Sequence, residues 1–121
     1  MAKQSILRDK SFAFAVQIVK LCNYLREEKK DFVLSKQLIR SGTSIGSNIE
    51  EAAGAQSDKD FIAKLHIALK ESNETRYWIR LLKECQYLSS DESVNLLNNV
   101  NEIIALLTSS LKTLKAKCGQ V

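Results

Sequence analysis

Proline is absent from this sequence, and glycine occurs only four times in 121 residues. Proline breaks helices and is a common turn residue, so its absence permits long uninterrupted helices. A fold of many strands would need many more turn signals than the sequence contains. Because 45% of the residues are hydrophobic, a chain of this length can bury one core. We therefore expect a single helical domain over residues 1–121.

The sequence also has little that could hold a metal ion or cross-link the chain. Its single histidine, His66, cannot complete a common zinc set, and three widely spaced cysteines, Cys22, Cys85 and Cys118, do not form a disulfide framework. Cys22 and Cys85 lie among apolar positions, so we expect both in the core. No N-terminal run resembles a signal peptide, and no stretch of about 20 apolar residues could span a bilayer. We therefore expect a cytoplasmic protein with free thiols and no membrane partner.

Apolar periodicity predicts four helices, over about residues 4–26, 35–54, 58–88 and 91–117. Short loops between long helices make sequential neighbours antiparallel, so we expect an all-α, antiparallel up-down-up-down four-helix bundle. The last helix has the most regular pattern, in alternating steps of three and four residues, which is typical of helices packed near +20°. Its predicted seam consists of Leu97, Val100, Ile104, Leu107, Leu111, Leu114 and Cys118.

Several polar residues mark the predicted helix ends. Ser35 and Ser57 are candidate N-caps for the second and third helices, because a serine hydroxyl can accept a hydrogen bond from an otherwise unpaired backbone amide. Ser89 or Ser90 caps the fourth helix, and Ser89 to Glu92 has the spacing of a capping box. Gly54 marks the end of the second helix.

The third predicted helix has more apolar surface than one core requires. One stripe includes Leu65, Ala68 and Ile79, and a second stripe includes Trp78 and Leu81. A helix that is apolar on two sides is central in its domain or shared with another subunit, which favours self-association here. The first helix carries a flanking stripe of Phe12, Val16 and Val19.

The segment from Arg40 to Ala52 is rich in small residues and has poor helix propensity, yet it keeps an apolar period. A hairpin of the second and third helices places Gly42 opposite Glu71 and brings Arg40 within about one turn of Glu74. We expect the small residues to pack closely against the third helix, while Arg40 pairs with one of the two glutamates. The alternative is that Arg40 is an ordinary surface side chain. The predicted close-packing and ion-pair cluster consists of Arg40, Gly42, Gly46, Glu71, Glu74 and Trp78.

Enzyme motifs are missing from the sequence. A di-iron bundle needs a Glu-x-x-His on each of two helices, and this sequence contains none. Gly42 and Gly46 match neither GxGxxG nor a P-loop, and HExxH and GxSxG are also absent. Glu71 and Glu74 could in principle act as acid-base groups, but pairing with arginine is the favoured interpretation. We expect no enzyme activity, no metal and no cofactor.

Several separated blocks of sequence resemble one protein family. The run Ile39 to Glu51, followed by Lys59 to Phe61, Ala68 to Ser72 and Glu74 to Trp78, is similar to the bacterial four-helix-bundle family encoded in intervening sequences of 23S rRNA genes, also labelled S23 ribosomal protein. The resemblance covers about residues 8–115. It implies a ring-like homopentamer of antiparallel bundles. A more distant likeness is to the accessory variability protein of diversity-generating retroelements, a basic pentamer that binds nucleic acid and a reverse transcriptase, although this sequence lacks its stronger basic character.

The net charge of +4 permits nucleic-acid contact without requiring it. The leading hypothesis is a non-enzymatic homo-oligomer that binds RNA, or DNA, through phosphate contacts on its basic outer faces. The alternative is an interaction scaffold for an unidentified protein, with no nucleic-acid role. The candidate nucleic-acid contacts are Lys3, Arg8, Lys10, Lys20, Arg26, Lys29, Lys30, Arg80 and Lys83.

Overall fold

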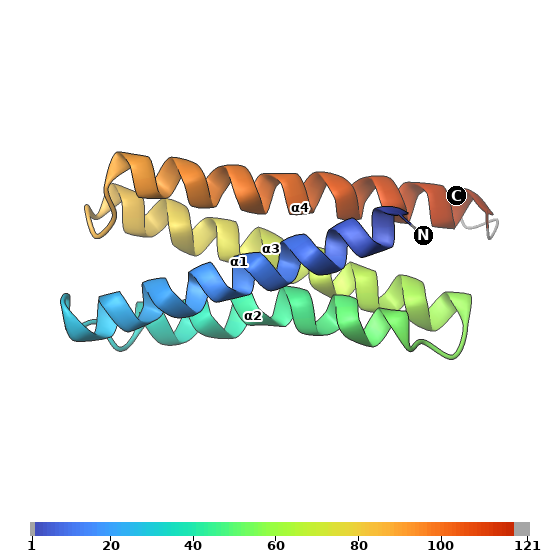
Figure 1. The fold of residues 1–121 in the computed structure, drawn as a ribbon, viewed down its shortest axis with the longest axis horizontal. Coiled ribbons are helices and arrows are strands. Elements are labelled where there is room, and N and C mark those ends of the chain that lie inside the picture. Colours follow the sequence, from blue (N-terminus) through green and yellow to red (C-terminus); the bar gives the residue numbers. More distant parts are fainter. Residues whose placement is uncertain (1, 118–121) are drawn as a thin grey trace.

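The computed structural model describes residues 2–117 and consists of four long helices (Figure 1). They are α1 (Ala2–Glu27), α2 (Leu34–Ala53), α3 (Asp58–Glu84) and α4 (Ser90–Lys117). Helices α1 and α3 each pack against both α2 and α4, and within the described residues no Cα atoms of the diagonal pairs lie within 8 Å of each other. Consecutive helices run in opposite directions (Figure 1). The predicted all-α, antiparallel four-helix bundle is therefore confirmed.

Helix α3 ends earlier than predicted, at Glu84 instead of Leu88. Gln86 adopts a left-handed conformation, with φ at 63°. Its amide donates to the carbonyl of Lys83, and the amide of Tyr87 donates to the carbonyl of Leu82, which is the pattern of a Schellman motif. Leu88 is nevertheless buried, so the apolar period continues past the end of the helix. For this reason the predicted helix was longer than α3.

The predicted caps of α3 and α4 are confirmed. The Ser57 hydroxyl accepts a hydrogen bond from the Asp60 amide at 3.0 Å. At the start of α4, the Ser89 amide donates to a carboxylate oxygen of Glu92 at 3.1 Å, and the Glu92 amide donates to the Ser89 hydroxyl at 3.1 Å. Two backbone donors that the helix cannot satisfy are thereby paired reciprocally.

The predicted cap of α2 is wrong, because Asp31 takes the role assigned to Ser35. One carboxylate oxygen of Asp31 accepts hydrogen bonds from the amides of Val33 and Leu34, at 2.9 and 3.0 Å. Ser35 lies within the first turn and donates its hydroxyl to the Asp31 carbonyl at 2.7 Å. A carboxylate can accept two amide donors at the positive end of the helix, which a single hydroxyl does less well. Gly54 follows the end of α2, as predicted.

The core runs the length of the bundle. The face that α4 buries in this core differs slightly from the predicted one. Leu96 and Ile103 are buried, whereas Leu97 and Ile104 are half-buried. Helix α4 packs against both α1 and α3, so the centre of its buried face lies between the two neighbours. Cys118, the last member of the predicted seam, lies outside the described residues. Among residues 2–117, no helix is both long and apolar enough to cross a membrane.

Helix α1 lies close to α4 over its N-terminal part and separates from it towards the α1–α2 loop (Figure 1). Polar contacts join the two helices in the first part, where Lys10 pairs with Glu102 and Gln17 exchanges hydrogen bonds with Asn95 and Asn99. Beyond Gln17 a groove opens between α1 and α4, and Tyr24 lines it.

Candidate functional site

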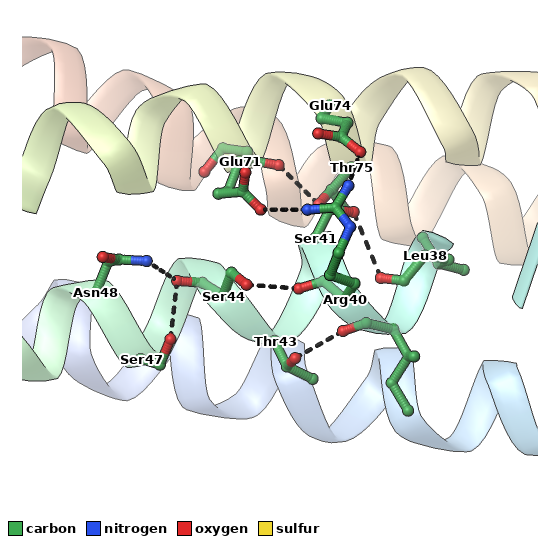
Figure 2. A network of polar contacts seen from close by, with 12 residues as sticks. Leu38, Arg40, Ser41, Thr43, Ser44, Ser47, Asn48, Glu71, Glu74 and Thr75 are labelled. Atoms are coloured by element: carbon green, nitrogen blue, oxygen red, sulfur yellow. Dashed lines mark hydrogen bonds and ion pairs between the residues drawn. The ribbon is translucent and has the colours of Figure 1, made fainter. Parts of the chain in front are cut away.

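Arg40 links α2 to α3 through two carboxylates (Figure 2). One guanidinium nitrogen donates to Glu71 Oε2 at 3.1 Å, and the other contacts Glu74 Oε2. The Glu71 side chain is 11% exposed and that of Arg40 is 48% exposed. The Trp78 indole nitrogen donates to the same oxygen of Glu74 at 3.1 Å. The structure therefore brings four of the six predicted cluster residues into one network of charge-assisted hydrogen bonds.

Small polar side chains surround this network and satisfy their hydrogen bonds locally. The hydroxyl groups of Ser41 and Thr75 are buried between α2 and α3 and form a hydrogen bond of 2.9 Å (Figure 2). On α2, Thr43 and Ser44 each donate to the carbonyl four residues earlier, at 2.6 Å. Burying a hydroxyl without a partner is unfavourable. These bonds therefore explain how a segment with so many hydroxyl groups remains helical inside the bundle.

Gly42 and Gly46 were predicted to pack against α3. The structure shows that both pack against α1 instead. A Cβ atom at Gly42 would lie 2.8 Å from Cγ2 of Ile18, and one at Gly46 would lie 3.5 Å from the carbonyl oxygen of Ser11. Successive helical residues point about 100° apart. With Ser41 directed at α3, the next residue faces the other neighbour of α2. The absence of a side chain at Gly42 therefore allows α1 to approach α2 closely.

Two of the nine predicted nucleic-acid contacts are engaged by carboxylates. Arg8 and Glu50 form a two-point hydrogen bond, at 3.1 and 3.0 Å. The Arg8 hydrogen bond and its positive charge hold the pKa of the Glu50 carboxyl below its usual value. Lys10 pairs with Glu102 at 2.6 Å. Both cations are partly compensated and are weaker candidates for phosphate contact.

The other seven cations have no carboxylate partner among residues 2–117. Lys3 donates to the Ser109 hydroxyl at 2.9 Å, and Arg26 lies 5.9 Å from the centre of the exposed Phe32 ring. The structure does not gather all seven into one patch. The remaining ones lie either on α1 and the loop that follows it or on α3, and they are Lys20, Lys29, Lys30, Arg80 and Lys83.

Arg80 and Lys83 line a groove between α3 and α4 together with Arg76 and Tyr77. Neither Arg76 nor Tyr77 was among the predicted contacts. The spacing of four and three residues from Arg76 through Arg80 to Lys83 places these cations on one helix face, and this signal was present in the sequence.

The thiols and the histidine offer no evident catalytic site in the described residues. Cys22 is buried, its Sγ lies 3.4 Å from the Ser35 carbonyl oxygen, and desolvation raises its pKa to about 11, so little reactive thiolate forms at neutral pH. The prediction that Cys85 is buried is wrong, because it is exposed at the C-terminal cap of α3. His66 is exposed. Among residues 2–117, no group of His, Cys, Asp and Glu side chains is placed to hold a metal ion.

Comparison with known proteins shows a clear similarity at both the sequence and the fold level. The model of the 23S rRNA-intervening sequence protein family matches residues 3–109. A crystal structure of a protein of unknown function from the S23 ribosomal protein family of Bacteroides thetaiotaomicron shares 52% sequence identity with this chain. The match covers 91% of this chain and 98% of the other, with a TM-score of 0.89. No curated protein matches the chain.

Proposed function

Because this chain belongs to the 23S rRNA-intervening sequence protein family, we propose that it is a non-enzymatic homo-oligomer that binds RNA through its basic outer faces. The observation that carries the RNA-binding part is the group of seven candidate cations that are in none of the ion pairs formed among residues 2–117. Uncompensated cations on a folded surface attract phosphates and release counterions when they bind them. The raised pKa of the buried Cys22 thiol fits the non-enzymatic part of the proposal, because a thiol with such a pKa forms little reactive thiolate at neutral pH.

The stripe of Phe12, Val16 and Val19 on α1 supports the homo-oligomer. These side chains are 72%, 39% and 38% exposed, at spacings of four and three residues. The adjacent Arg8 and Glu50 are paired with each other, so their two charges partly compensate beside the stripe. An exposed apolar stripe of this kind is typical of a surface that another subunit covers. A ring, as the family resemblance implies, would also need a second and different face on each subunit.

Binding to RNA is expected to depend steeply on salt. If the protein engages about four phosphates, the logarithm of the association constant should fall with the logarithm of salt concentration with a slope of about −3. Fluorescence anisotropy with a labelled hairpin RNA, recorded over a series of potassium chloride concentrations, measures this slope. Absence of binding at the lowest salt concentration would overturn the RNA proposal. Co-purification with a protein after crosslinking in cells, without RNA, would then favour the interaction scaffold.

Replacing Phe12 with aspartate is expected to abolish self-association. The wild-type protein should sediment as an oligomer at micromolar concentration, whereas Phe12→Asp should sediment near the monomer mass of 13.6 kDa, because burying an unpaired carboxylate in an apolar contact is strongly unfavourable. Val94 is also exposed, at 51%, but lies on α4, so Val94→Asp is the matched control and should remain an oligomer. A monomeric wild type, or equal effects of the two variants, would contradict the assignment of the α1 stripe.

A further inference from the structure

The groove between α3 and α4 has a volume of about 410 Å³ and combines cations with an exposed aromatic ring. Arg76, Arg80 and Lys83 follow its α3 side at spacings of four and three residues. Residues at these spacings are neighbours on a helix surface, about 5–6 Å apart at their Cβ atoms. Tyr77 lies beside them with 54% of its surface exposed. The groove therefore combines a row of positive charge with an exposed aromatic ring.

The positive charge of this groove is not cancelled within the described chain. Arg76 donates to the neutral amide oxygens of Asn101 and Asn73, at 3.1 and 3.0 Å, and so keeps its full charge while its guanidinium is held in place. The other two cations of the row make no ion pair among residues 2–117. Glu84 supplies the one carboxylate of the lining. Three cations against one anion favour an anionic occupant.

The Tyr77 ring has an aromatic neighbour on its own helix. It contacts the Trp78 ring in an edge-on arrangement, with 5.1 Å between the ring centres and 73° between the ring planes. Trp78 is itself fixed by the hydrogen bond from its indole nitrogen to Glu74. Leu81 and Leu97 add apolar surface to the same groove. A ring that already has such a contact loses less conformational freedom when a flat ligand stacks on it than a ring without one.

We propose that the α3–α4 groove binds unpaired nucleotides of RNA, with one base stacked on Tyr77 and the flanking phosphates contacting Arg80 and Lys83. This proposal rests on the RNA binding proposed above and names the part of the RNA that is recognised. Every base has a π-face, so stacking on an aromatic side chain tolerates any sequence. Bases in a continuous duplex are already stacked on one another, whereas those of loops, bulges and ends are free. The groove therefore selects unpaired segments over duplex.

The test compares a labelled short oligouridylate with a labelled blunt RNA duplex by fluorescence anisotropy, using the full chain. Tyr77→Ala should weaken oligouridylate binding about tenfold, as loss of one stacked base predicts, and should leave duplex binding unchanged. Tyr77→Phe keeps the ring and should bind like the wild type.

Tyr24 is a comparably exposed tyrosine, at 40%, in the groove between α1 and α4. Tyr24→Ala is therefore the matched control and should bind oligouridylate like the wild type. Arg80→Ala should weaken both probes and reduce the salt slope by about one.

The outcomes separate this proposal from the function on which it rests. If the wild type binds neither probe at low salt, the RNA-binding function and the groove proposal both fail. If it binds both probes and Tyr77→Ala does not weaken oligouridylate binding selectively, RNA binding stands and the groove proposal fails. Displacement of oligouridylate by oligoglutamate of equal charge would show that charge alone fills the groove, and would also overturn it. A parallel oligothymidylate probe shows whether single-stranded DNA presents the same chemistry.

Discussion

Gly42→Ala is expected to lower the free energy of unfolding by about 2 kcal/mol, because the added methyl group overpacks the contact between α1 and α2. The new Cβ atom would lie 2.8 and 2.9 Å from Cγ2 and Cγ1 of Ile18. Ile18 is completely buried, and a β-branched side chain in a helix has one strongly preferred rotamer. It cannot rotate away, so the helices must separate. For a domain of this size the melting temperature should fall by about 8 °C.

Gly46→Ala is the matched control, because it makes the same chemical change one turn later in the same helix. Its added Cβ would meet the Ser11 backbone at 3.5 Å, which is an ordinary contact distance. The helix-propensity gain of alanine over glycine, up to about 1 kcal/mol, is then realised. The two variants should therefore shift the denaturation midpoint in opposite directions. Urea titrations followed by circular dichroism measure both shifts.

A double-mutant cycle identifies Ile18 as the cause. Ile18→Ala alone should cost about 2–5 kcal/mol, as expected when a buried side chain is truncated. In the Gly42→Ala background it should cost at least 1 kcal/mol less, because the truncation removes the atoms that the new methyl group strikes. If Gly42→Ala is as stable as Gly46→Ala, or if the cycle shows no coupling, close approach of α1 is not the reason for glycine at this position.

The course of the chain was predictable from local signals in the sequence. Helix starts at Ser57 and Ser89 are specified by side chains within three residues of the amides that they cap, so short-range chemistry is enough to find them. The cap of α2 was assigned to the wrong residue because Asp31 and Ser35 are both capable caps. Only the path of the loop decides between such candidates. The end of α3 was missed because buried Leu88 continues the apolar pattern after the helix has ended.

Which neighbour each inward residue faces was not predictable to the same degree. Periodicity indicates that Gly42 and Ser41 both point into the bundle, but it does not distinguish α1 from α3 as the partner. That choice depends on helix rotations and crossing angles, which side-chain packing between elements determines. Cys85 was expected in the core because it continues an apolar stripe, but α3 ends at Glu84 and Cys85 is exposed at its cap. The groove around Tyr77 was not predicted, because the spacing of Arg76, Arg80 and Lys83 indicates a shared helix face but does not show that an exposed ring and a groove lie beside it.

Arg40→Ala is expected to lower the free energy of unfolding by about 2 kcal/mol, because it leaves a mostly buried carboxylate without its counter-charge. The Glu71 side chain is 11% exposed and accepts a hydrogen bond from Arg40. Breaking a fully buried pair costs about 3–5 kcal/mol. The Arg40 side chain is 48% exposed, so water screens part of the interaction and the smaller figure applies. Arg40→Lys should give an intermediate loss, because one ammonium group cannot reproduce a planar fork that contacts two carboxylates.

The decisive comparison neutralises the carboxylate that is left behind. If the loss arises from the unpaired charge of Glu71, then adding Glu71→Gln to Arg40→Ala should recover at least half of it, because a neutral amide costs less to bury than a carboxylate. Arg8 supplies the matched control. It also bonds a glutamate, but both side chains of that pair are about half exposed, so Arg8→Ala should change stability little.

Equal small losses for Arg8→Ala and Arg40→Ala, with no recovery by Glu71→Gln, would make Arg40 an ordinary surface side chain. A large loss that Glu71→Gln reverses would instead identify Arg40 as the charge that makes a buried glutamate tolerable on α3.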